Sequence, residues 1–330
     1  MIIDGHAHAV HGKYLDLVYD AGGDWIKDKT AFLHRIKPQI FDIPLRLQWL
    51  ERNGIDVQVV TAHHTLDCNL FPGHAVAKLK LARAINDNLS RIREDSKGKM
   101  IPVASIPMVD FQKYGIKEMD RAITTLGFKG VNLPSNLNGK PLDLPEFEAF
   151  WAYASQMNAP VFIHPHDPAG QSDRSYEAEY SLTISLGWPF EIMLTLCRIV
   201  FSGLLDRYPN LKIVTHMGGG IPFYWGRLNE TYHPEQQSRT IGRVLPRPLI
   251  DYFSRFYYDT AIGGNASAIK CAYEIFGSSQ IIFATDAPWG PDTGEFRLKK
   301  YQKAIESLKL SSEDNQRIFC DNAKSLLNPN

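Results

Sequence analysis

Short apolar runs alternate with longer amphipathic segments along this chain of 330 residues. Most of the runs are apolar at consecutive positions, which indicates β-strands covered on both faces, as in a parallel sheet. Strands of this kind are expected at residues 2–4, 57–61, 101–106, 129–133, 160–164, 212–216, 256–259 and 281–285.

The segments between these runs repeat apolar residues at three- and four-residue steps, which is the period of one helix face. Two of them are followed by glycine, Gly54 and Gly127, a residue that commonly ends a helix. Helices are expected at residues 42–53, 75–93, 114–126, 146–157, 188–208, 266–276 and 296–308.

Repeated strand–helix units connect by right-handed crossovers and build a parallel sheet. Eight units favour an α/β fold of the closed (β/α)8 TIM barrel type, although an open doubly wound sheet also fits the pattern. Two segments exceed a minimal barrel, residues 11–41 after the first strand and residues 167–187 after the fifth. We therefore predict a single barrel domain over residues 1–330, with insertions after strands 1 and 5 on the face where barrel enzymes keep their sites.

Composition and charge narrow the classes of partner. Lys plus Arg and Asp plus Glu are 36 each, so the balance predicts neither a nucleic-acid nor an anionic membrane partner. The chain opens on an apolar strand without the pattern of a signal peptide, and no apolar run reaches 18 residues. The four cysteines are far apart and form no CxxC pair, which favours free thiols and a reduced, cytoplasmic protein.

The candidate chemistry lies where four of the predicted strands end. The first strand ends in Asp-Gly-His-Ala-His, and positions two apart in an extended chain face the same side, so His6 and His8 can grip one cation. This motif alone is a weak signal. It is strengthened by His164 after the fifth strand, His216 after the sixth and Asp286 after the eighth. In a closed barrel these ends meet at one mouth, and imidazole with carboxylate suits Zn²⁺ and related ions.

The pattern HxH, His, His and Asp on strands one, five, six and eight resembles the amidohydrolase superfamily. Residues 201–220, 221–228 and 256–260 resemble its aminocarboxymuconate semialdehyde decarboxylase-like branch, which includes resorcylate and carboxyvanillate decarboxylases and oxalomesaconate hydratase. The resemblance covers nearly the whole chain and is weakest for the substrate.

The resemblance implies a set of roles for these residues. His6, His8, His164 and Asp286 would hold the metal, while His216 would activate the bound water as general acid or base, with Asp286 as a second catalytic group. Binuclear relatives carry a carbamylated lysine at the tip of strand four, where this chain reads Val-Asn-Leu-Pro. One divalent ion is therefore expected, Zn²⁺ by default with Mn²⁺ as the alternative.

The leading functional hypothesis is a decarboxylase, a carbon–carbon lyase acting on a small aromatic or conjugated carboxylic acid. A hydrolase or hydratase with the same mononuclear site is the alternative, and a non-enzymatic binding barrel is a third. Guanidinium binds carboxylate by a bidentate fork. By the resemblance, Arg227 would reach the substrate of a neighbouring subunit, which hints at a homodimer, unless it is a surface residue. Arg35 is the candidate for a second substrate arginine.

Other side chains are expected near the substrate. His166 would contact the substrate or support a ligand through a hydrogen bond. Trp188 and Trp289 would wall the pocket, with core packing as the alternative for each. His63 and His64 follow the second strand and are placed at the mouth of the barrel.

Overall fold

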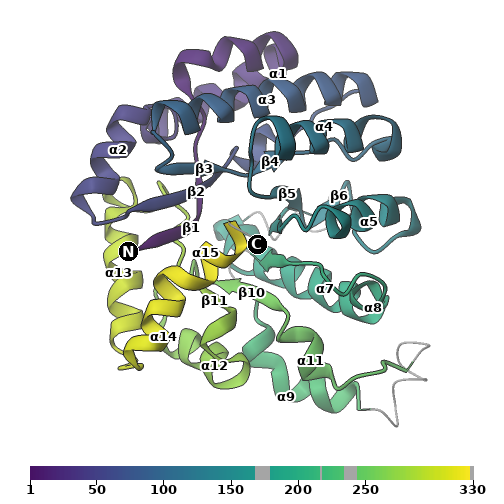
Figure 1. Ribbon diagram of the computed structural model, residues 1–330. Coiled ribbons are helices and arrows are strands. Elements are labelled where there is room, and N and C mark those ends of the chain that lie inside the picture. Colours follow the sequence, from purple (N-terminus) through teal and green to yellow (C-terminus); the bar gives the residue numbers. More distant parts are fainter. Residues whose placement is uncertain (168–178, 216–217, 234–243, 328–330) are drawn as a thin grey trace.

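The computed structural model describes residues 1–167, 179–215, 218–233 and 244–327, and it shows parallel strands ringed by helices (Figure 1). The strands pair in two parallel sheets, of order β1-β2-β3 and β11-β10-β9-β8-β5-β4. The strands that form them are β1 (Ile3–His8), β2 (Val57–Thr61), β3 (Met100–Pro102), β4 (Ala104–Ser105), β5 (Val131–Pro134), β8 (Val161–His164), β9 (Ile213–Thr215), β10 (Phe256–Asp259) and β11 (Ile281–Ile282).

The two sheets join at the segment predicted as one strand over residues 101–106. Val103 separates β3 from β4 and donates its backbone N–H to Val60 of β2, whereas Ala104 donates to the carbonyl of Gly130, just before β5. The segment thus exchanges one neighbour for the other within two residues. This is why it forms two short strands rather than the continuous strand that its apolar pattern predicts.

A second seam, between β1 and the chain around β11, closes the barrel. The Gly5 N–H donates to the Phe283 carbonyl at 2.8 Å, and Ala7 pairs in parallel with Ala287. A Cβ atom on Gly5 would lie 2.4 Å from Cγ2 of Ile282 and 3.2 Å from the Phe283 carbonyl oxygen, so only glycine permits this approach. The barrel prediction is therefore confirmed, and the open-sheet alternative is wrong.

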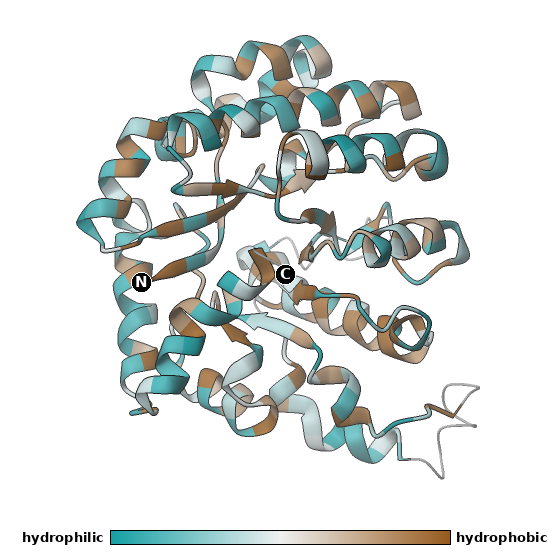
Figure 2. Cartoon of the chain, viewed as in Figure 1, coloured by the Kyte–Doolittle hydropathy of each residue, from teal (hydrophilic) through white to brown (hydrophobic). Residues whose placement is uncertain are grey.

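The interior of the barrel is filled at the end opposite the strand tips. A cluster of buried side chains from several strands packs there against the C-terminal helix α15 (Asn322–Leu327), which crosses that end in Figure 1. Figure 2 shows most of the strands in the hydrophobic colour. The members of this cluster include Ile3, Val59, Val103, Phe162, Val214, Ile282, Cys320, Ala323, Leu326 and Leu327.

Most of the predicted helices are present with small shifts at their ends. The predicted helix over residues 188–208 divides where Gly203 adopts φ +74°, a left-handed conformation that stops α7 before α8 begins. The helices are α1 (Leu15–Ile36), α2 (Ile43–Arg52), α3 (Ala75–Asp95), α4 (Ile116–Asp120), α5 (Glu148–Gln156), α7 (Trp188–Phe201), α8 (Leu204–Arg207), α9 (Ile221–Thr231), α11 (Leu249–Phe253), α12 (Ala266–Phe276), α13 (Glu295–Glu306), α14 (Ser312–Gln316) and α15.

The two predicted insertions take different forms. The first is mainly helix α1, which lies along α3 (Figure 1) and buries Val18, Ile26 and Leu33 on one face. In the second, residues 168–178 lie outside the described part of the chain, and short helical turns then lead into α7. A small antiparallel hairpin of β6 (Asn136–Leu137) and β7 (Lys140–Pro141) follows β5 and was not predicted.

One helical run among the described residues, Glu179–Phe201, is long and apolar enough to cross a membrane by length and composition. The count of consecutive apolar residues missed it because polar residues such as Glu191 interrupt it. Its C-terminal part is α7, where Ile192, Leu196 and Ile199 are buried in the main core of the protein. Core packing accounts for this buried face of α7, but only 28% of the apolar window is buried, and Ile184, Leu186 and Phe190 in this run are exposed.

Candidate metal centre

Three imidazole rings converge at the mouth of the barrel. His6 and His8 come from the end of β1, and His164 is the last residue of β8. One nitrogen of each ring lies within 4.8 Å of the others, and all three side chains are buried. Alternation along β1 places two histidines on one face, as the sequence predicted, and barrel closure brings the third to them.

Asp286 adds a carboxylate to this cluster. Its Oδ1 lies 3.3 Å from Nε2 of His8, and its backbone N–H donates to the His6 carbonyl at 3.0 Å. The residue adopts φ +58°, a conformation that aspartate tolerates better than most side chains. Three imidazole nitrogens and a carboxylate oxygen form a donor set that suits one first-row divalent ion. The residues present therefore fit a single metal site.

Hydrogen bonds fix the orientation of two of the rings. His164 donates its Nδ1–H to the Pro165 carbonyl at 2.7 Å, because a carbonyl oxygen can only accept. Its Nε2 is consequently the nitrogen with a lone pair for a metal. Nδ1 of His8 lies 3.0 Å from the Thr61 hydroxyl, which leaves Nε2 turned toward Asp286. Such outer hydrogen bonds hold ligands in position and raise their basicity.

A buried carboxylate supports the ligands from behind. Asp4 accepts hydrogen bonds from the Thr285 N–H at 2.9 Å, from the Thr285 hydroxyl and from Gln58 Nε2 at 2.7 Å. It also lies 3.4 Å from the backbone N–H of His6. Burial raises the pKa of Asp4 to about 6, and these hydrogen bonds oppose the rise. Asp4 thus ties β1 to the segment that carries Asp286.

Aromatic rings line the mouth beside the cluster. The ring of Trp289 lies 5.2 Å from that of His63, and the His63 ring lies 5.1 Å from that of His8. On the other side, Trp188 lies 5.9 Å from the His164 ring. Both tryptophans are half-buried, so the structure places them at the mouth rather than in the deep core. Burial lowers the pKa of His63 well below its usual value, with His64 and His8 contributing.

Two cations that sequence reasoning did not single out also reach this region. Nη1 of Arg297, on α13, lies 3.3 Å from Oδ2 of Asp286, and Nζ of Lys37 donates to the Gly290 carbonyl at 2.7 Å. Burial and the charge of Arg297 lower the pKa of Lys37. Arg297 also borders a cavity of about 780 Å³ that Tyr301 lines as well. A signal for Arg297 was its place in the first turn of the helix after strand eight.

The remaining predicted site residues are distributed as follows. Arg35 is exposed on the last turn of α1, with its guanidinium 5.7 Å from the Phe32 ring, and Arg227 is exposed on α9. His166 is half-buried, and burial lowers its pKa. His216 lies outside the described residues.

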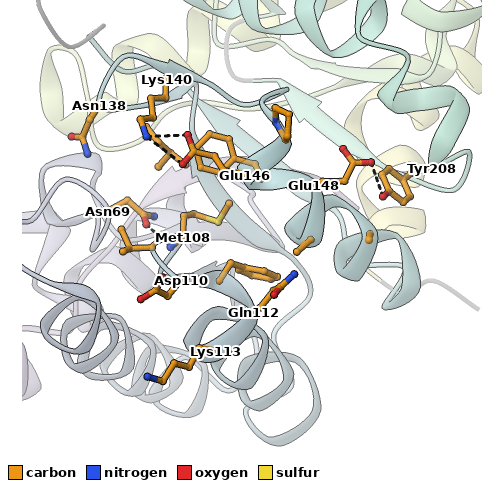
Figure 3. Close-up of a pocket in the computed structure, with 17 residues that line it drawn as sticks. Asn69, Met108, Asp110, Gln112, Lys113, Asn138, Lys140, Glu146, Glu148 and Tyr208 are labelled. Atoms are coloured by element: carbon orange, nitrogen blue, oxygen red, sulfur yellow. Dashed lines mark hydrogen bonds and ion pairs between the residues drawn. The ribbon is translucent and has the colours of Figure 1, made fainter.

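A hollow of about 900 Å³ lies between the segment after β4, the β6–β7 hairpin and the start of α5 (Figure 3). The described metal ligands do not line it. Among its charged side chains, Lys140 lies 3.0 Å from Glu146, and Glu148 accepts a hydrogen bond from Tyr208 at 2.8 Å. The hollow is therefore a groove between surface elements, separate from the metal centre.

Known proteins resemble this chain over nearly its full length. The amidohydrolase family model matches residues 3–328. A 2-amino-3-carboxymuconate-6-semialdehyde decarboxylase of Dictyostelium discoideum is 29% identical, covering 87% of this chain and 81% of the relative. A gamma-resorcylate decarboxylase of Polaromonas sp. is 26% identical, covering 89% and 90%.

The fold is shared with solved structures. A dihydroxybenzoic acid decarboxylase from Polaromonas sp. JS666, with bound manganese and the inhibitor 2-nitroresorcinol, matches with a TM-score of 0.78 at 22% identity, covering 99% of this chain and 96% of that one. Together with the converging histidines, the family match over residues 3–328 shows that this chain belongs to the amidohydrolase family, in the branch that contains these decarboxylases.

Proposed function

We propose that this protein is a metal-dependent decarboxylase that releases CO2 from a small aromatic or conjugated carboxylic acid. The observation that carries the proposal is the convergence of His6, His8 and His164 with Asp286 at a mouth lined by aromatic rings. Flat aromatic surfaces favour a planar substrate. The decarboxylases among the relatives support the reaction class.

The chain's own groups suit the proton chemistry. A bound divalent ion would supply a Lewis acid that polarises the oxygens of the substrate. We assign to Asp286 the delivery of a proton to the carbon that bears the carboxylate. The carbon–carbon bond then breaks, CO2 leaves, and the bonding electrons return to the conjugated system. His216 is proposed as a further general acid or base, by the resemblance of its segment to the family.

We propose Zn²⁺ as the default metal, because three imidazoles and one carboxylate match its preferences. Mn²⁺ is the alternative, supported by the manganese in the Polaromonas structure. Metal analysis of the purified protein, followed by removal and separate reloading with each ion, decides between them. The ion that is both retained on purification and restores CO2 release is the cofactor.

Carboxylate recognition is assigned to the cations near the mouth. Arg297 and Lys37 both contact the loop after β11, so they are placed to balance a negative substrate. The predicted roles of Arg35 and His166 as substrate contacts and of Trp188 and Trp289 as pocket walls stay part of the proposal.

A homodimer is proposed through the face formed by residues 183–187, the start of α7 and α9. This face exposes apolar side chains next to Arg227, which fits the expected contribution of Arg227 to a neighbouring subunit. Sedimentation of the protein would show the dimer, and a monomer at assay concentration would contradict it. The exposed apolar residues are Ile184, Leu186, Phe190, Leu194, Phe223 and Tyr224.

The experiment that tests the reaction is product analysis with the metal-loaded protein. We would supply 2,6-dihydroxybenzoate, 6-methylsalicylate and a muconate-type acid, and measure both CO2 and the remaining acid. CO2 release in step with loss of the acid supports the decarboxylase. Incorporation of water without CO2 would support the hydrolase or hydratase instead.

The four free thiols fit the expected cytoplasmic location, which fractionation of the source cells would test.

A further inference from the structure

His63 is a buried histidine for which the chemistry described above has no use. It follows β2, and its side chain is 2% exposed. Its ring lies 5.1 Å from that of the metal-ligand candidate His8 and 5.2 Å from that of Trp289. The ring therefore borders both the metal centre and the aromatic wall.

The contacts of His63 determine which of its nitrogens carries the hydrogen. The backbone N–H of Thr65 donates to Nδ1 at 3.3 Å, and the Thr65 hydroxyl lies 2.9 Å from the same nitrogen. A backbone amide can only donate, so Nδ1 is the acceptor and the hydrogen resides on Nε2. This assignment follows from the hydrogen-bond geometry and does not depend on the titration of the ring.

Nε2 of His63 is buried and has no hydrogen-bond partner within the described part of the chain. Buried polar groups in native proteins are nearly always paired, and exceptions usually mark a functional site or a place for a ligand or water. A donor without an acceptor, beside a metal centre, is a group prepared for an oxygen that arrives with the substrate.

We propose that His63 is a specificity-determining residue whose Nε2–H donates a hydrogen bond to a second oxygen of the substrate, beside the carboxylate held at the metal centre. Because His63 lies directly against a ligand, that oxygen must be close to the carboxylate in the same molecule. The ortho hydroxyl of a 2-hydroxybenzoate meets this requirement, and a plain benzoate does not. The inference rests on the proposed function only in requiring that an aromatic acid binds at the metal.

Two variants test the role of the donor. His63→Phe keeps a ring and removes the donor, whereas His63→Gln places an amide donor near the position of Nε2. Binding of 2,6-dihydroxybenzoate and of benzoate to the manganese-loaded wild type and variants would be measured by calorimetry, together with metal content. A matching metal content shows that each variant is folded and holds its ion.

We expect His63→Phe to weaken the binding of 2,6-dihydroxybenzoate by roughly five- to tenfold, the usual effect of one hydrogen bond, and that of benzoate by less than about twofold. His63→Gln should recover most of the loss. Equal losses for the two acids, or no loss for either, would overturn the inference and leave His63 a structural neighbour of Trp289. Absence of 2,6-dihydroxybenzoate binding to the wild type would overturn it as well.

The outcome is separable from that of the proposed reaction. If the expected binding pattern is seen but no CO2 is released from any acid, the decarboxylase proposal fails and the role of His63 stands. If CO2 is released but His63→Phe weakens the binding of the two acids equally, the decarboxylase proposal stands and the role of His63 fails.

Discussion

Replacement of the buried Asp4 by alanine tests how far barrel closure and metal binding depend on the same hydrogen bonds. The substitution removes the acceptor for the Thr285 N–H, the Thr285 hydroxyl and the Gln58 amide, all of which are buried. Three buried donors left without this acceptor cost about 1–3 kcal/mol each. Burial raises the pKa of Asp4 to about 6, which corresponds to a cost of about 3 kcal/mol for the buried charge. The three lost hydrogen bonds together cost about 3–9 kcal/mol, and relief of the buried charge offsets about 3 kcal/mol of this, so we expect a net loss of up to about 6 kcal/mol in the free energy of unfolding.

The assay is denaturant unfolding of the metal-free protein, combined with chelator competition for metal affinity. Since Asp4 connects the strand of His6 to the residue before Asp286, we expect metal affinity to fall by about 10- to 100-fold. Asp4→Asn should have a smaller effect on stability and metal affinity than Asp4→Ala. Gln58 Oε1 has no hydrogen-bond partner among the described residues, so after the Gln58 amide flips it can accept from the amide of the new asparagine. Asp56→Ala is the matched control, removing an exposed carboxylate that accepts from a backbone N–H. Stability and metal affinity both within error of wild type in Asp4→Ala would refute the reasoning.

Three further predictions concern the seam, the ligands and a buried acid. Gly5→Val should lower the free energy of unfolding by about 1–3 kcal/mol, because the new Cβ would collide with Ile282 and the carbonyl oxygen of Phe283. An unchanged melting temperature would contradict this. Thr61→Val removes the hydroxyl beside His8 and should weaken metal binding by about tenfold in chelator competition, whereas unaltered affinity would exclude an orienting role. Burial raises the pKa of Asp67 to about 6, so its folded state holds the proton more tightly than the unfolded state. Stability should therefore fall as pH rises from about 4 to 6, by about 3 kcal/mol, and denaturation of Asp67→Asn should lose that part of the slope.

The strands and helices were predictable because their periodicity reports burial. β2 and α12 have the predicted ends; α12 begins after the capping residue Asn265 and ends before Gly277, two residues typical of helix boundaries. The break at Gly203 was missed because glycine inside an apolar helical pattern does not reveal the sign of its φ. The division of the strand at Val103 depends on which neighbours the chain meets, which periodicity does not encode.

The convergence of the candidate metal ligands was predictable for a different reason. His6, His8, His164 and Asp286 each follow an apolar strand, and the fold brings all such strand ends together. Lys37 and Arg297 follow no strand. They reach the mouth because the insertion that ends near Lys37 and the helix that carries Arg297 both pack against the loop at Gly290, and Lys37 is distant from this loop in the sequence. The place of Arg297 in the first turn of the helix after strand eight was a signal, but nothing in the sequence indicates that Lys37, far away in the chain, meets the same loop.

Asp286 shows why closure of the barrel and construction of the metal site are one event. The backbone hydrogen bond from Asp286 to His6 belongs to the seam between the first strand and the last. The same bond fixes the left-handed backbone from which the carboxylate reaches His8. A seam loosened at Gly5 or Asp4 would therefore let the carboxylate and the imidazoles drift apart. It follows that substitutions at the seam should lower metal affinity together with stability, and that bound metal should restore part of the stability they remove.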